Sequence, residues 1–217
     1  MGMESFDVNG VKRQGYLALP ASGKGPGVLV LHAWWGLNEV FRGVCDKLAK
    51  EGFVAFAPDV HHGVVTSDKA EALNIVQTRD FAAAMATTQA GLGYLQKHPA
   101  VTSKQLGALG FSMGGSFATE LDKANPDALK AIVTFYDDWA AQNYKTSKAR
   151  FLFHFAENDP EVADEIAKAV KGENATVYFY PGTHHWFFEE NRPEDYVPEA
   201  ARLAWERTVA FFKIQRS

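Results

Sequence analysis

The hydrophobic pattern near the start of the chain predicts a strand, a helix and a second strand. Residues 27–32 and 53–58 are almost continuously apolar, which is typical of strands buried on both faces of a parallel sheet. Between them, residues 39–51 carry apolar side chains at every fourth position and so predict a helix with one buried face. Asn38 is suited to cap the start of this helix and Gly52 to end it. These segments together predict a βαβ unit.

The same alternation of strands and helices continues along the chain. Further strands are predicted at residues 106–111, 128–136, 150–155 and 176–180. Helices are predicted at residues 67–98 (as one helix or as two), 116–123, 160–171 and 198–214. This order predicts an α/β fold with a mostly parallel central sheet and helices on both faces. A length of 217 residues favours a single domain over residues 1–217.

The first nineteen residues predict an antiparallel hairpin at a sheet edge. Residues 4–8 and 11–19 show some alternation of apolar and polar positions, and Asn9-Gly10 stands between them. Asn-Gly is a strong signal for a two-residue hairpin turn, because both positions require positive φ.

Composition and charge exclude several classes of partner. The net charge is −4, the pI is about 6.0, and no run of Lys or Arg forms a basic patch, so we expect no binding to nucleic acid. The N-terminal residues lack the pattern of a signal peptide, and no apolar stretch is long enough to cross a membrane. We therefore expect a cytoplasmic protein. The single cysteine, Cys45, lies in the first predicted helix and is expected to be a buried structural thiol.

Candidate chemistry begins with a Gly-x-Ser-x-Gly motif at Gly110, Ser112 and Gly114. The motif joins a predicted strand to a predicted helix, which is the context of a nucleophile elbow. Glycines flank the serine because a side chain at either position would collide across so sharp a turn, and Gly115 leaves further room. The motif predicts that Ser112 is a nucleophile, the alternative being a structural turn.

A serine nucleophile requires a base, and a histidine base is usually oriented by an acid. Asp159 follows the strand predicted at residues 150–155, and His185 follows the strand at 176–180, which is the order that α/β hydrolases use. Glu157 on the same loop is an alternative acid, although Asp159 is favoured by its place at the far end of the loop. His184 is an alternative base, and spacing alone does not separate the two histidines.

Two backbone N–H groups are candidates for an oxyanion hole. The N–H of Met113 follows the nucleophile, and the N–H of Trp34 lies on the loop after the strand at residues 27–32. The indoles of Trp34 and Trp35 are expected to pack in the core or to form a wall of an apolar substrate pocket.

No metal site is predicted. His61 and His62 are adjacent and lack a ligand spacing to Cys or to further His, so an exposed loop pair is expected. Asp59, at the end of a buried strand, is expected to make structural hydrogen bonds. The chemistry predicted here requires no cofactor.

Four blocks in this order resemble the dienelactone hydrolase family over almost the whole chain: VLHAWWGLN (30–38), LAKEGFVAFAPD (48–59), GFSMGG (110–115) and YPGTHHWF (180–187). The resemblance implies a compact α/β-hydrolase fold without a large cap. It also favours His185 over His184, because the family's histidine lies two residues before a phenylalanine, here Phe187.

The chain also departs from the proteins that gave the family its name. Those proteins have a cysteine at the position of Ser112, and a glutamate that pairs with it where this chain has Ala33. The arginines that bind the dienelactone carboxylate have no clear counterpart. Glu189 stands four residues after His185, and the nearest cations of the helical region are Lys69 and Arg79. On this interpretation of Glu189, no strong preference for anionic substrates is expected.

The leading hypothesis is a serine hydrolase that cleaves a small carboxylic ester or lactone through an acyl-enzyme. Ser112, His185 and Asp159 would form the triad, with Met113 and Trp34 as oxyanion donors. The alternative is a catalytically silent α/β-hydrolase fold that binds a ligand or partner. The sequence leaves the substrate and the oligomeric state open.

Overall fold

A central sheet of eight strands organises the described part of the chain. The computed structural model describes residues 1–160, 162, 164–170 and 172–214, and its strand order is β1-β2-β4-β3-β5-β6-β7-β8. Strands β3 to β8 pair in parallel, whereas β2 pairs antiparallel with both β1 and β4. The strands are β1 Gly2–Val8, β2 Val11–Ala18, β3 Gly27–Leu31, β4 Val54–Pro58, β5 Leu106–Phe111, β6 Leu129–Phe135, β7 Arg150–Asn158 and β8 Ala175–His184.

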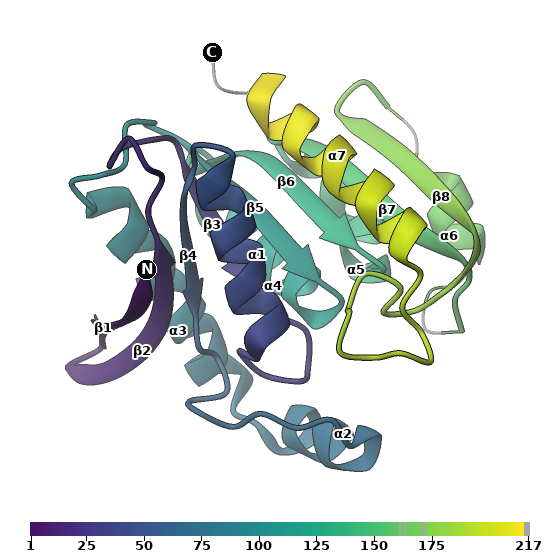
Figure 1. Cartoon of the computed structure of the whole chain (residues 1–217), viewed down its shortest axis with the longest axis horizontal. Helices are drawn as coiled ribbons and strands as arrows, with labels where there is room; N and C mark the ends of the chain where they lie inside the picture. The colour runs from purple at the N-terminus through teal and green to yellow at the C-terminus, as the bar shows by residue number, and fades with distance from the viewer. Residues whose placement is uncertain (161, 163, 171, 215–217) are drawn as a thin grey trace.

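Helices cover both faces of this sheet (Figure 1). They are α1 Glu39–Lys50, α2 Lys69–Thr78, α3 Phe81–Lys97, α4 Met113–Ala124, α5 Asp138–Asn143, α6 Asp164–Ala169 and α7 Pro198–Ile214, with a short 3-10 helix at Tyr144–Thr146. Buried residues of α1 and α7 share one hydrophobic cluster with the sheet, and those of α3, α4, α5 and α6 share the other. Helix α2 lies beyond the end of the sheet, where the carboxyl ends of the parallel strands meet. The predicted α/β fold is confirmed.

Local sequence signals account for the first turns. Asn9 and Gly10 have φ values of 52° and 85°, as a two-residue hairpin turn requires, and the β1–β2 hairpin lies at the sheet edge as predicted. The side chain of Asn38 accepts hydrogen bonds from the backbone N–H groups of Val40 and Phe41 at the start of α1, and Gly52 follows the helix with a φ of 89°. These short-range predictions are confirmed.

Several predicted helices have different bounds. Helix α4 begins at Met113 instead of residue 116, and the region 67–98 contains two helices, each with its own aspartate cap. Helix α5 was not predicted, and its cap is Asp137. The helix predicted at residues 160–171 is the shorter α6, and residues 161, 163 and 171 of that prediction lie outside the described residues.

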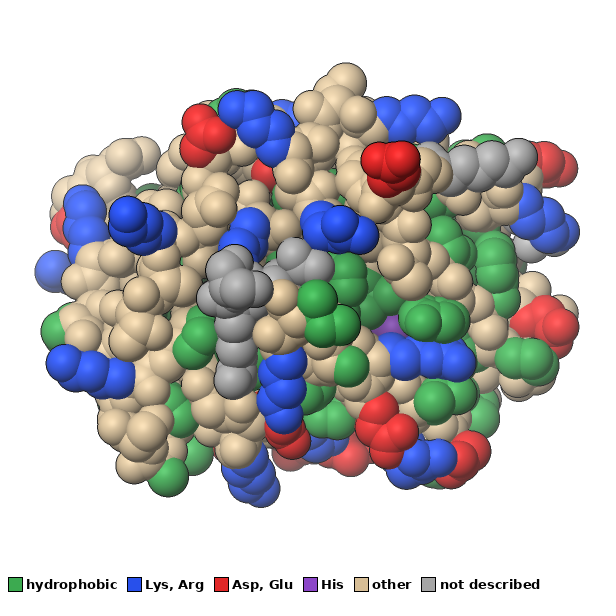
Figure 2. Space-filling view, turned by 90° about the horizontal axis from the view of Figure 1, so that it is seen from above, with side chains coloured by type: hydrophobic (Ala, Val, Ile, Leu, Met, Phe, Trp, Pro, Cys, Tyr) green, Lys and Arg blue, Asp and Glu red, His purple; other side chains and the backbone are tan. Residues whose placement is uncertain are grey.

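The surface in Figure 2 carries acidic and basic side chains interspersed with one another. Within the described residues, none of the helices combines the length and the apolar character that crossing a membrane would demand.

Candidate active site

Ser112 occupies a strained turn between β5 and α4. Its φ of 49° and ψ of −120° are unusual for a residue with a side chain, and such strain is typical of functional sites. A Cβ at Gly110 would lie 2.5 Å from backbone atoms of Gly114, and a Cβ at Gly114 would lie 2.1 Å from the carbonyl oxygen of Leu31. The steric role predicted for both glycines is therefore confirmed, and it fixes the turn that presents Ser112.

Asp137 lies on the other side of the same turn. A Cβ at Gly115 would lie 2.4 Å from Oδ2 of Asp137, so Gly115 makes room for that carboxyl group as well. The Oδ1 atom of Asp137 accepts hydrogen bonds from the Ser116 hydroxyl and from the N–H of Trp139. Burial raises the pKa of Asp137 to about 7. This carboxyl group therefore joins the start of α4 to the start of α5 by hydrogen bonds.

Ser112, His185 and Asp159 form a continuous chain of hydrogen bonds. The Nδ1 atom of His185 lies 2.8 Å and 2.9 Å from the two carboxylate oxygens of Asp159, and its Nε2 lies 3.0 Å from Oγ of Ser112. An ionised carboxylate only accepts, so Nδ1 carries the proton and Nε2 is free to accept the Ser112 hydroxyl. The side chains of His185 and Asp159 are buried. The arrangement leaves a basic nitrogen aimed at the serine.

Strand register explains why residues so far apart in the chain meet. Asn158 pairs with His184 at the ends of β7 and β8, so Asp159 and His185 leave the sheet side by side. Phe111 pairs with Phe135, and the N–H of Ser112 donates to the carbonyl of Phe135 at the ends of β5 and β6. All of these strand ends lie on the edge where ligands bind in open α/β sheets.

The two rival residues point elsewhere. The exposed carboxylate of Glu157 accepts a hydrogen bond from the N–H of Gly182. His184 is exposed, and its Nδ1 lies 3.0 Å from the carbonyl oxygen of Asn158, to which it donates. Among the described residues, Asp159 is thus the acid that contacts His185, and His185 is the histidine that contacts Ser112.

Of the two candidate oxyanion donors, the N–H of Met113 belongs to the residue directly after the nucleophile. Met113 is the first residue of α4, where a backbone N–H has no partner within the helix. Trp34 lies on the loop after β3, and the close approach of Gly114 to the carbonyls of Leu31 and His32 places the start of α4 against the end of β3. The half-buried indole of Trp34 stacks on Trp186, the residue after His185, at 5.7 Å between ring centroids.

His32 fixes the conformation of that loop. Its Nδ1 donates to the carbonyl of Ala33 at 2.7 Å, and its Nε2 accepts from the N–H of Val60 at 3.2 Å. Burial lowers the pKa of His32 to about 4, so the ring is neutral. The sequence patterns gave no signal for this role, since Val60 lies on a different loop, 28 residues further along the chain.

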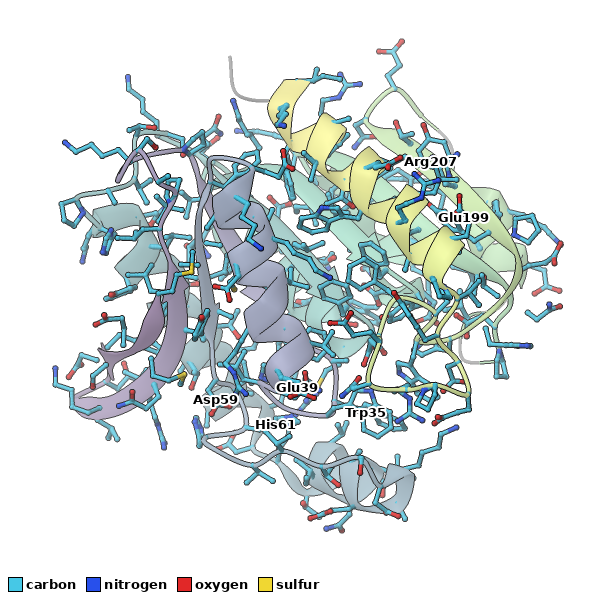
Figure 3. The ribbon with its side chains drawn as sticks, viewed as in Figure 1. Trp35, Glu39, Asp59, His61, Glu199 and Arg207 are labelled. Atoms are coloured by element: carbon cyan, nitrogen blue, oxygen red, sulfur yellow. The ribbon has the colours of Figure 1, made fainter. Side chains whose placement is uncertain are left out.

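The prediction of an exposed pair at His61 and His62 is wrong for His61. His61 is buried against the ring of His32, and burial lowers its pKa to about 3, whereas His62 is exposed. The cause is the turn made by Asp59, whose carboxylate accepts the N–H groups of His61 and Gly63. The structural role predicted for Asp59 is confirmed, and Figure 3 shows Asp59 and His61 together near α2.

One lysine and one arginine side chain lie close to the site. The ammonium of Lys69 lies 4.6 Å from the ring centroid of Trp186. A guanidinium nitrogen of Arg79 contacts the sulfur of Met113, and the group lies over the ring of Phe117. Within the described residues Arg79 has no carboxylate partner, and burial lowers its pKa.

Glu189 does not face this surface. Its side chain is fully buried, and it accepts a hydrogen bond from the hydroxyl of Tyr136. The sequence position, four residues after His185, suggested a residue of the substrate pocket, but the turn at residues 186–189 directs the carboxyl inward. Tyr136, whose ring packs against His185, was not identified from the sequence.

Comparison with known proteins identifies the family. The model of the dienelactone hydrolase family matches residues 14–215. The chain belongs to the dienelactone hydrolase family. It is 37% identical to "Protein usf" of Aquifex pyrophilus and 36% identical to a "Putative carboxymethylenebutenolidase" of Aquifex aeolicus, in each case over 97% of both chains. The crystal structure of a "Putative Dienelactone Hydrolase" from Klebsiella pneumoniae superposes with a TM-score of 0.84 at 24% identity, covering 98% of this chain and 97% of the other.

Membership of the dienelactone hydrolase family makes the chain a carboxylic ester hydrolase with the α/β-hydrolase fold, as the sequence predicts. Within the family, the serine at position 112 is a departure from the cysteine of the namesakes. The one cysteine of the chain does not replace it, because Cys45 is fully buried in α1 and burial raises the pKa of its thiol.

Proposed function

We propose that this dienelactone hydrolase homologue is a serine hydrolase that cleaves small carboxylic esters or lactones through an acyl-enzyme. The observation that carries the proposal is the chain of hydrogen bonds from Asp159 through His185 to Ser112, at 2.8 Å and 3.0 Å, ending on a strained serine. A structural turn requires neither the strain nor a buried imidazole beside it.

Acylation follows from the proton positions. The Ser112 oxygen attacks the carbonyl carbon while Nε2 of His185 takes the hydroxyl proton, and the carbonyl electron pair moves to the oxygen. The N–H groups of Met113 and Trp34 donate to that oxyanion. When the tetrahedral intermediate collapses, the bond to the leaving oxygen breaks and His185 returns the proton to it. Asp159 holds the ring and stabilises the imidazolium between these steps.

Deacylation repeats the sequence with water. His185 takes a proton from a water molecule, the resulting hydroxide attacks the acyl carbon, and the Ser112 oxygen leaves with that proton. For a lactone, the leaving oxygen stays attached to the acyl group, so the product is a single hydroxy acid.

The surroundings of Ser112 support small, partly apolar substrates. The half-buried indole of Trp34, stacked on Trp186, provides an aromatic wall beside His185, whereas Trp35 is buried and packs in the core. The name of the Aquifex aeolicus relative refers to an unsaturated lactone. Because the Glu189 carboxyl is buried against Tyr136, it no longer argues against an anionic substrate, as the sequence had suggested. Lys69 and Arg79 lie beside Trp186 and Met113, and they favour a substrate that bears an acidic group.

The other expectations from the sequence are part of the same proposal. We propose that residues 1–217 act as one domain in the cytoplasm, that the partner is the small-molecule substrate, and that neither nucleic acid nor a membrane is bound. The mechanism requires no metal or other cofactor, because groups of this chain transfer the protons and stabilise the oxyanion.

The test is a Ser112→Ala variant assayed on aryl esters and lactones, together with labelling by a fluorophosphonate probe. We expect the wild type to hydrolyse at least one ester and to form one adduct at Ser112, and the variant to lose both. A variant with full esterase activity would refute the proposal. A folded wild type with neither activity nor adduct would favour the silent binding protein.

A further inference from the structure

The ring of Tyr136 forms a wall against the imidazole of His185. The two ring centroids lie 4.7 Å apart with an interplanar angle of 50°. Tyr136 follows β6 directly, its side chain is fully buried, and its φ is +43°. Such a φ is costly for a tyrosine, and the surrounding structure must stabilise it.

Glu189 holds this tyrosine from the loop that carries His185. Its Oε1 accepts a hydrogen bond of 2.8 Å from the Tyr136 hydroxyl, across 53 residues of sequence. The loop between His185 and Glu189 is itself tight, since the N–H of Glu189 donates to the carbonyl of Trp186 and the N–H of Arg192 donates to the carbonyl of Glu189. One hydrogen bond therefore joins the end of β6 to the histidine loop.

Burial favours the neutral form of the Glu189 carboxyl. Burial raises its pKa to about 8, the hydrogen bond from Tyr136 and the charge of Arg192 oppose that rise, and Asp195 adds to it. Its second oxygen is buried without a hydrogen-bond partner among the described residues, which disfavours an ionised form. Burial also keeps the Tyr136 hydroxyl protonated by raising its pKa well above the usual value. Burial thus favours the uncharged form of both partners in this hydrogen bond.

We propose that Glu189 is a positioning residue, which holds the Tyr136 ring against His185 and so fixes the imidazole in line with Ser112. The inference rests on the proposed function, in which His185 takes the Ser112 proton.

The geometry shows why such a wall is required. The bond from Nδ1 of His185 to Asp159 fixes one end of the ring, but rotation of the ring about its side-chain bonds moves Nε2 away from the serine. The Tyr136 ring blocks this rotation on one side. The Trp186 ring lies edge-on to the imidazole, with 4.7 Å between the two ring centroids. A displacement of about 1 Å in a catalytic group costs about 100-fold in rate, so a loosened wall lowers kcat more than it changes substrate binding.

The experiment compares three replacements of Glu189. Glu189→Gln keeps the chain length and a neutral acceptor for the Tyr136 hydroxyl, Glu189→Asp keeps the acid but shortens the reach, and Glu189→Leu removes the acceptor. We expect kcat of the Gln variant to stay within about twofold of the wild type, and kcat of the Asp and Leu variants to fall roughly tenfold or more with KM nearly unchanged. The rate of Ser112 labelling by a fluorophosphonate should fall in parallel, because it reports the same proton transfer without substrate binding.

Two further variants separate positioning from loss of folding. In Tyr136→Phe/Glu189→Leu both partners are apolar, so no buried polar group is left unpaired and the fold is retained, while kcat should still fall. Thr208→Val removes a comparable buried hydrogen bond, to Nε2 of His154, away from the site, and should keep the wild-type kcat.

All variants are assayed at a temperature at which thermal melts show that each of them is folded, so that a loss of kcat does not reflect unfolding. The inference is overturned if the folded Leu and double variants keep the wild-type kcat, or if Asp restores kcat and Gln does not, since charge would then be what matters. Ser112→Ala separates the two proposals. If it abolishes activity while the Glu189 variants have no effect, the positioning role alone fails, whereas activity retained in Ser112→Ala refutes the serine mechanism itself.

Discussion

The Nε2 atom of His185 lies 3.0 Å from the Oγ atom of Ser112, although 73 residues separate them in the chain. Each residue follows a parallel strand, so both side chains emerge at the same edge of the sheet. The sheet thereby brings together a nucleophile and a base that no local sequence contact connects.

Replacing Asp159 by Asn tests the acid of this group. The Asn side chain offers an N–H to Nδ1 of His185 and so favours the wrong tautomer, with the proton on Nε2. We expect kcat to fall roughly 10³–10⁴-fold with the fold retained. Steady-state kinetics on an aryl ester measures the effect. Glu157→Gln is the matched control, because it keeps an acceptor for the N–H of Gly182 and should leave kcat within about twofold.

Replacing Gly114 by Ala tests the packing of the nucleophile turn. The new Cβ would lie 2.1 Å from the carbonyl oxygen of Leu31, and neither backbone segment can move without distorting the sheet. We expect a loss of at least about 3 kcal/mol in the free energy of unfolding. Gly43→Ala in α1 is the control, since its Cβ meets no atom within 4 Å and should stabilise the helix by up to about 1 kcal/mol. Equal effects in urea unfolding would contradict this account.

The raised pKa of Asp137 should make the free energy of unfolding decrease as the pH rises. Its pKa is raised from 3.8 to about 7 by burial, so between these values the folded state binds more protons than the unfolded state. The stability of the wild type relative to Asp137→Asn should therefore be greatest near pH 4 and decrease up to about pH 7, by on the order of 2–4 kcal/mol. Urea unfolding of both proteins from pH 4 to pH 8 measures the difference. Parallel curves would show that folding does not raise the pKa of Asp137.

Replacing Arg79 by Gln tests whether the substrate pocket prefers anionic substrates. Its guanidinium contacts Met113 and has no carboxylate partner within the described residues, so it is available to an anionic substrate. We expect Arg79→Gln to lower kcat/KM for an aryl hemisuccinate about tenfold, and for the matching acetate by less than twofold. Lys97→Gln, at the far end of α3, should change neither value. An equal loss on both esters would place Arg79 in the packing of the turn instead.

Most of the fold was predictable because its signals are short-range. Asn9-Gly10 specifies a hairpin through backbone conformation alone, and Asn38 specifies a helix start through its own side chain. The buried strands of the parallel sheet were visible as continuous apolar runs. The positions of Ser112, Asp159 and His185 after three strands of the parallel sheet were also predictable, since strand order determines where loops gather.

The errors concern features that depend on tertiary contacts. Helix α4 was placed three residues late because Gly114 and Gly115 are poor helix formers, and only the packing against Leu31 and Asp137 explains them. His61 is buried through contact with the ring of His32, which lies on another loop. The inward direction of Glu189 depends on Tyr136, 53 residues away, so no local pattern could reveal it.

The acyl-enzyme is the central claim, and mass spectrometry of the protein quenched in acid during turnover of p-nitrophenyl acetate tests it most directly. We predict that the intact wild type gains one acetyl group, that fragmentation places it on Ser112, and that Ser112→Ala gains none. Turnover with no covalent adduct, or an acetyl group on another residue that persists in Ser112→Ala, would contradict the mechanism.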